Sequence, residues 1–157
     1  MRRSDREVRD FNEIVEIIER CDVCRLALND KDYPYILPLN FGMEVTDGSV
    51  KLYFHGACEG RKYEIIKKDN RASFEMDCAH RLVLDEEQKN CTMEYESVIG
   101  YGIIEEITDE NEKIQALRII MKQYHNEEFQ FNIDVVPKTR ILKLTVKNMT
   151  GKKRKKH

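Results

Sequence analysis

Apolar residues recur with a helical period in two stretches of this 157-residue chain. One stretch lies near the N-terminus between charged positions and predicts an amphipathic helix that ends near Cys21. The other predicts a helix over residues 109–124, which Thr108 or Asp109 could cap. The two apolar faces comprise Phe11, Ile14, Val15, Ile17 and Ile18, and Ile114, Leu117, Ile120, Met121 and Tyr124. Each helix therefore has one face that covers another part of the protein.

Most other apolar residues fall in β-rich runs separated by turn residues such as "NDKD" and "TDGSV". Six strands are predicted, over residues 23–30, 33–45, 50–55, 71–77, 91–107 and 139–151. Because they do not alternate with helices, a parallel sheet is not expected. The pattern favours a mainly β fold: a closed or nearly closed antiparallel barrel of six strands with peripheral helices, which leaves few exposed edges.

Three further parts of the chain carry structural signals of their own. Residues 60–70 predict a short helix, and the acidic stretch 78–90 is interpreted as irregular. Gly100 and Gly102 lie inside a predicted strand, where glycine indicates a bulge, a barrel bend or the close approach of a ligand.

Composition indicates a globular chain of the size of one domain, with 41% hydrophobic residues. No apolar run has the length of a signal peptide or a membrane span, so we expect a cytoplasmic protein without a membrane partner. The five cysteines are an odd number, and reduced thiols are expected rather than a disulfide framework.

Charge is distributed unevenly along the chain. Residues 152–157 contain five of the 27 cations, so residues 1–151 carry 22 cations against 29 acids, a net charge of −7. An acidic body argues against a nucleic-acid partner. We therefore predict a single folded domain over residues 1–151 and a basic, disordered tail over residues 152–157.

Two thiol-based sites can be considered. Cys21, Cys24, His55 and Cys58 would supply the four ligands of a zinc site, but Cys21 ends a helix and Cys24 enters an apolar strand, where small buried thiols are common. A nucleophilic Cys58 would need His55 to orient it, and their spacing does not show this. We expect no metal site and interpret Cys58 as a loop thiol.

The stretch "HGACEGRK", residues 55–62, favours a third chemistry. Gly56 and Gly60 let backbone N–H groups approach an anion, and Gly60 precedes the start of a helix, where the dipole is positive. Arg61 and Lys62 add two full charges, one able to bind phosphate with two hydrogen bonds and the other as a point charge. The pattern predicts a mononucleotide phosphate site.

The ordered set "VCRLALND", "YPYILPLNFG", "LYFH", "EGRK" and "SVIGYG" resembles the flavin-binding split-barrel superfamily of pyridoxamine-phosphate oxidase, and within it the nitroimidazole-resistance branch. The resemblance covers residues 1 to about 151. It implies an FMN-binding, six-stranded split barrel, with FAD as a possible cofactor, and a homodimer with flavin at the subunit interface.

The same resemblance implies roles for individual residues. Arg61 and Lys62 would bind the phosphate, and Gly60 begins their helix. Ser97 would make a polar cofactor contact, and His55 is the candidate for catalysis. The ribityl and phosphate side would be lined by His55, Gly56 and Ala57, and the isoalloxazine edge by Pro38, Leu39, Asn40 and Phe41.

The chain also departs from the oxidases, because it has no Trp and lacks their arginine-rich C-terminal segment. Vitamin B6 oxidation is therefore not expected. We expect an FMN-dependent reductase for small electron-poor molecules such as nitroimidazoles. The alternative is a flavin- or haem-binding module that stores, senses or carries its cofactor without catalysis.

Overall fold

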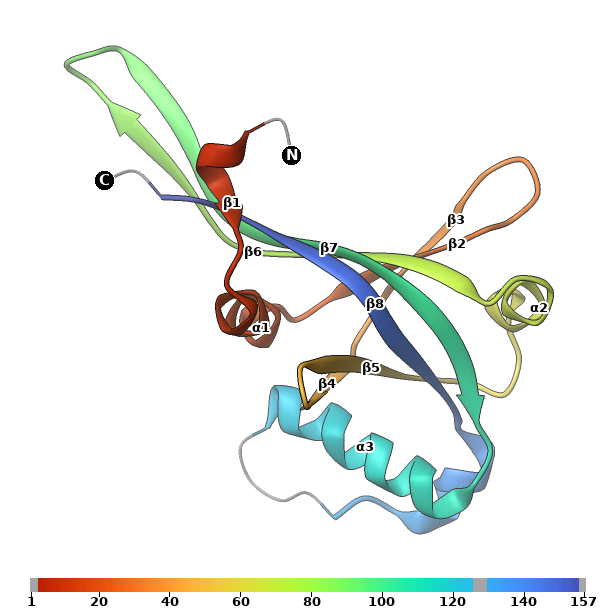
Figure 1. The fold of residues 1–157 in the computed structure, drawn as a ribbon. Coiled ribbons are helices and arrows are strands. Elements are labelled where there is room, and N and C mark those ends of the chain that lie inside the picture. The colour runs from red at the N-terminus through yellow and green to blue at the C-terminus, as the bar shows by residue number, and fades with distance from the viewer. Residues whose placement is uncertain (1–2, 126–129, 156–157) are drawn as a thin grey trace.

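The computed structural model describes residues 3–125 and 130–155. Figure 1 shows a strongly curved antiparallel sheet with helices around it. The helices are α1 (Phe11–Arg20), α2 (Arg61–Lys68) and α3 (Glu110–Tyr124), with two short 3₁₀ helices, η1 (Ser4–Arg6) and η2 (Ile133–Lys138). The strands are β1 (Glu7–Val8), β2 (Cys24–Leu28), β3 (Tyr35–Leu39), β4 (Gly42–Thr46), β5 (Ser49–Gly56), β6 (Arg71–Asp85), β7 (Asn90–Ile107) and β8 (Arg140–Arg154).

The strands form one sheet in the order β3-β2-β6-β7-β8-β5-β4, and β1 pairs with β8. The first and last strands of this path do not pair with each other within the described residues, so the barrel is split between β3 and β4. The mainly β, antiparallel split barrel with peripheral helices is therefore confirmed. The strand count differs from six because the predicted run 33–45 divides into β3 and β4, and because β1 was not predicted.

The main core lies inside the curved sheet and under α1. Its largest wholly buried side chains include Phe41, Phe54 and Phe74. Helix α1 presents Ile14, Ile17 and Ile18 to this core, as its periodicity predicts. The branched and aromatic side chains fill the interior, and the burial of each one contributes about 1.5–3 kcal/mol of favourable transfer free energy.

Helix α3 packs on the side of β4 and β5 that faces away from the main core. There it forms a second, smaller cluster with Tyr53 and Ile141. The Asp109 side chain caps it by accepting a hydrogen bond from the Glu112 N–H (2.9 Å), as predicted. At its other end, Gln123 donates to three carbonyl groups at the C-terminal end of α1, the nearest being that of Cys21 (3.0 Å). This amide therefore satisfies carbonyls that a helix end leaves without partners.

The glycines of β7 are explained by the sheet itself. The register of β7 and β8 shifts between Tyr101 and Gly102, and a Cβ atom at Gly102 would lie 2.1 Å from the Thr145 carbonyl oxygen. A Cβ at Gly100 would meet the Phe74 ring at 2.5 Å. The bulge is therefore confirmed, and the atoms that approach the two glycines closely belong to Thr145 and Phe74 of the protein itself.

Two predictions about irregular segments are wrong. The acidic stretch 78–90 is not irregular, because β6 and β7 continue as a hairpin that projects beyond the barrel (Figure 1). We call residues 81–94 of this hairpin the arm. Residues 152–154 are not a disordered tail, because β8 continues to Arg154 and pairs with β7 as far as Tyr95. His157, at the end of the predicted tail, lies outside the described residues.

Candidate functional site

The loop between β5 and α2 has the geometry that the sequence predicts. Strand β5 ends at Gly56, α2 begins at Arg61, and Gly60 occupies the position before the helix with φ = 154°, a value that favours glycine. A Cβ atom on Gly56 would lie 2.6 Å from the Tyr63 hydroxyl and 3.0 Å from the Lys62 ammonium nitrogen. The absence of a side chain at Gly56 therefore lets the first turn of α2 fold back over the loop.

The two predicted cations lie on this first turn. The Arg61 guanidinium is 67% exposed, forms an ion pair with Asp30 and lies 5.5 Å from the centre of the Tyr35 ring. The Lys62 ammonium lies 4.4 Å from the centre of the Tyr63 ring. Burial, together with the nearby charge of Arg140, lowers the pKa of Lys62. Because an anion would relieve this unfavourable environment, Lys62 is suited to bind one.

Sequence reasoning missed a third cation, Arg140 at the start of β8. Its guanidinium lies 3.6 Å from the centre of the Tyr63 ring and donates to the Cys58 carbonyl oxygen (3.3 Å). It also forms an ion pair with Glu106, and the hydrogen bond lowers the pKa of that carboxyl. Nothing in the local pattern around residue 140 marks it, because the contact joins segments about 80 residues apart. Three cations therefore surround the loop 56–60.

Tyr63 is the centre of this cluster. Its hydroxyl donates to the Ala57 carbonyl oxygen (2.7 Å), which fixes the loop, and the cations of Lys62 and Arg140 both lie over its ring. Cations over an aromatic face gain about 0.5–2 kcal/mol. The loop and its charges are thus held in place before any ligand arrives.

His55 and Cys58 do not form a catalytic pair. His55 is exposed near the end of β5, opposite Ile141 in the sheet, and its side chain makes no hydrogen bond or ion pair with another described residue. The Cys58 thiol donates to the Lys138 carbonyl oxygen (2.8 Å), so the imidazole does not orient it. Cys58 is the exposed loop thiol that we expected.

The proposed zinc ligands are not brought together. Cys21 and Cys24 are buried, burial raises the pKa of both thiols, and the Cys21 thiol donates to the Ile17 carbonyl oxygen (3.2 Å). In residues 3–125 and 130–155, no group of three or more His, Cys, Asp or Glu side chains could hold a metal ion.

The four residues predicted to line the isoalloxazine edge differ in where their side chains lie. Pro38 and Leu39 lie on β3 at the edge of the sheet, where the missing N–H of Pro38 costs no ladder bond. The side chain of Phe41 instead fills the core, and its backbone N–H donates to the Tyr124 hydroxyl (2.9 Å). Asn40 is exposed and donates to the Asp22 carbonyl oxygen (3.3 Å). A contact through the Phe41 side chain is therefore excluded in this structure.

Ser97 lies far from the phosphate loop of the same chain. On β8, Ile141 pairs with His55 and Lys152 pairs with Ser97. These two β8 residues are eleven positions apart, which is roughly 35 Å along an extended strand. Figure 1 shows β8 crossing the whole molecule between these two regions. Within one chain, Ser97 and the phosphate loop therefore lie beside opposite ends of β8.

The fold has counterparts among known proteins. The model of the family described as pyridoxamine 5'-phosphate oxidase matches residues 10–153. A solved structure of a candidate 5-nitroimidazole antibiotic resistance protein from Bacteroides thetaiotaomicron is 33% identical, with a TM-score of 0.81 over 93% of this chain and 85% of that one. No curated protein matches the chain.

Two more distant solved structures share the fold alone. The flavocytochrome Anf3 from Azotobacter vinelandii is 19% identical, with a TM-score of 0.80 over 99% of this chain and 72% of that one. An FAD- and haem-binding protein from Mycobacterium smegmatis is 16% identical, with a TM-score of 0.78 over 96% and 74%. None of the described helices has the length and apolar character needed to cross a membrane.

Proposed function

This chain belongs to the pyridoxamine 5'-phosphate oxidase family, and on that premise we propose that it is an FMN-dependent oxidoreductase. The observation that carries the proposal is the cluster of Arg61, Lys62 and Arg140 around a loop that two glycines keep open. Three cations at a helix start suit a phosphate dianion better than they suit a neutral ligand. FAD, which carries a pyrophosphate, remains the alternative form of the cofactor.

The chain supplies binding and orientation, while the flavin, when bound, supplies hydride and electron transfer. Arg61 and Lys62 would hold the phosphate, and the loop 56–60 would position it. His55 is the candidate for moving a proton, because it is exposed beside this loop and its reference pKa lies near neutrality.

For the substrate we propose small electron-poor molecules such as nitroimidazoles. The support is the relative from Bacteroides thetaiotaomicron, whose description names 5-nitroimidazole resistance and which aligns over most of both chains. The absence of Trp from this chain, and of the arginine-rich C-terminal segment, argues against a vitamin B6 substrate.

We also propose that the active form is a homodimer with flavin between the subunits. Ile36 (63% exposed), Ile99 (57%) and Tyr101 (53%) point outward from the same face of the sheet. Ser97 lies on this face as well, too far from the phosphate loop of its own chain. A two-fold partner seated on the face could bring its own loop to Ser97.

The test of the cofactor site is the double variant R61A/K62A. Each lost hydrogen bond to a charged group costs about 1.5–3 kcal/mol, so the double variant should weaken FMN binding at least 100-fold in a fluorescence titration. The matched control is K67A/K68A, which removes two exposed cations from the other end of α2. Equal affinities of the two double variants would place the phosphate elsewhere.

The alternative is a flavin- or haem-binding module without turnover, which the haem-containing neighbours of the same fold make worth testing. Steady-state consumption of NADH or NADPH with a nitroaromatic acceptor distinguishes the two functions. An enzyme would sustain many turnovers per flavin, whereas a binding module would show only stoichiometric bleaching of the cofactor.

A further inference from the structure

Within the described residues, the arm has one apolar face that its own chain leaves uncovered. Cross-strand pairing places Leu82 opposite Met93 and Leu84 opposite Cys91, and residues opposite each other share a face of a hairpin. Leu82 is 58% exposed, Leu84 63% and Met93 48%, and Cys91 is also exposed. Four adjacent side chains thus form an apolar patch at the end of a projecting hairpin.

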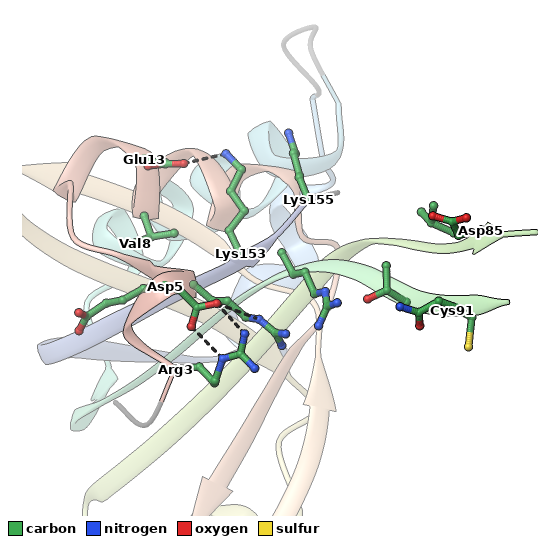
Figure 2. A pocket seen from close by; sticks show the side chains of 14 residues that line it. Arg3, Asp5, Val8, Glu13, Asp85, Cys91, Lys153 and Lys155 are labelled. Carbon is green, nitrogen blue, oxygen red and sulfur yellow. Dashed lines mark hydrogen bonds and ion pairs between the residues drawn. The ribbon is translucent and has the colours of Figure 1, made fainter. Parts of the chain in front are cut away.

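The other face of the arm does not pack tightly against the barrel either. Val83 and Thr92 line a cavity of about 690 Å³ between the arm, the N-terminal segment and the end of β8. Figure 2 shows Asp85 of the arm across this cavity from Arg3 and from Lys153, which forms an ion pair with Glu13 (2.7 Å). This polar hollow separates the arm from its own protein.

A two-stranded hairpin with an exposed apolar face is at best marginally stable alone in water. In the arm, polar cross-strand contact comes chiefly from Arg81 and Glu94, whose carboxylate and guanidinium are 2.7 Å apart. A covering partner would remove the exposed leucines from water at roughly 25 cal/mol for each Å² buried.

The apolar face of the arm continues the barrel face on which we place the partner subunit. Alternate residues of β7 point to the same side, so Met93 and Cys91 share a side with Ser97, Ile99 and Tyr101. The register shift between Cys78 and Arg81, where Ala79 has φ = 56°, brings Leu82 and Leu84 to this side too. The patch is therefore continuous with the barrel face that Ser97 occupies.

We propose that the apolar face of the arm packs on a second copy of this chain and extends the dimer interface beyond the barrel. This inference rests on the homodimer of the proposed function, and it adds the segment that grips the partner. Because an isologous interface uses the same patch on both subunits, two arms embrace one dimer. The arms also hold Ser97, at the base of the arm, against the partner's phosphate loop.

The test is the variant L82D/L84D, measured by analytical ultracentrifugation over a range of concentrations. We expect the dissociation constant of the dimer to rise at least tenfold. The matched control is I133D/V135D, which alters two other exposed apolar residues, 67% and 47% exposed, in η2. If L82D/L84D leaves the dissociation constant of the dimer unchanged, so that it does not differ from I133D/V135D, the proposal is overturned.

Photo-crosslinking gives a second measurement that does not depend on a destabilising variant. Benzophenone maleimide attached to Cys91 in a C58S background should yield a covalent dimer, whereas the same treatment of C58S/C91S should not. Products confined to one chain would overturn the proposal.

The two proposals fail separately. If the wild-type protein is a monomer that binds one FMN per chain, the proposed role of the arm is wrong and the proposed flavin site stands. If the protein forms a dimer that depends on the arm but binds no flavin, the proposed cofactor is wrong and the proposed role of the arm stands.

Discussion

The phosphate loop and the Ser97 face differ in how far one chain completes them. At the loop, Lys62 and Arg140 each already contact the Tyr63 ring, and Glu106 balances one of the charges. At the Ser97 face, the side chains of Ile99 and Tyr101 are more than half exposed. In the homodimer that we propose, one half of the site is pre-formed within a subunit, whereas the other half would be completed by the second chain.

The largest effect is expected from mixing two defective proteins. R61A/K62A damages the phosphate half and S97W blocks the other half, so each homodimer should bind little FMN. In randomly mixed dimers about half are hybrids, and each hybrid has one intact site of two, so about a quarter of all sites should recover. FMN fluorescence of the co-refolded mixture measures this. Hybrids that form without any recovery would place both halves of the site in one subunit.

A tenfold effect is expected at Arg140. R140A should weaken FMN binding by about 1.5 kcal/mol, the lower end for a hydrogen bond to a charged group, because a cation leaves the loop and the Tyr63 ring loses its neighbour. E106Q keeps the shape and removes the competing carboxylate, so it should bind FMN as tightly as the wild type or more tightly. Equal weakening in both variants, seen by calorimetric titration, would assign the pair a purely structural role.

The smallest effect concerns pH. Burial and the charge of Arg140 lower the pKa of Lys62, which carries its charge below that pKa and loses it above. FMN affinity should therefore be greatest at lower pH and fall as pH rises through the lowered pKa of Lys62. The K62R variant keeps its charge over this range and should lose that dependence. Parallel pH profiles of the two proteins would show that Lys62 does not meet the phosphate.

Local signals in the sequence are enough to predict several elements. The apolar period of α1 and the cap of α3 at Asp109 depend on residues within four positions of one another, and both are confirmed. The loop around Gly56 and Gly60 is local in the same sense, since glycine and cation lie on adjacent elements. The residues that determine these features therefore lie within the elements themselves or next to them in the sequence.

Other features depend on contacts between distant segments. Arg140 reaches the Cys58 carbonyl across 82 positions, and no pattern near residue 140 announces this. The position of Ser97 depends on the register of β7 against β8, which the bulge at Gly102 sets. The pattern of residues 78–90 indicates an irregular segment because its acidic turn follows a short apolar run, and within the described residues this run pairs only with the returning strand.

Strand β8 has a consequence for how this protein can vary. It begins at Arg140 beside the phosphate loop and pairs with Ser97 through Lys152, so its residue count fixes the span between the two halves. Inserting one residue into β8 would turn every following side chain to the opposite face of the sheet. Loops elsewhere can lengthen at small cost, whereas an extra residue in β8 would keep the following side chains on their faces only if a bulge, such as the one beside Gly102, absorbed it.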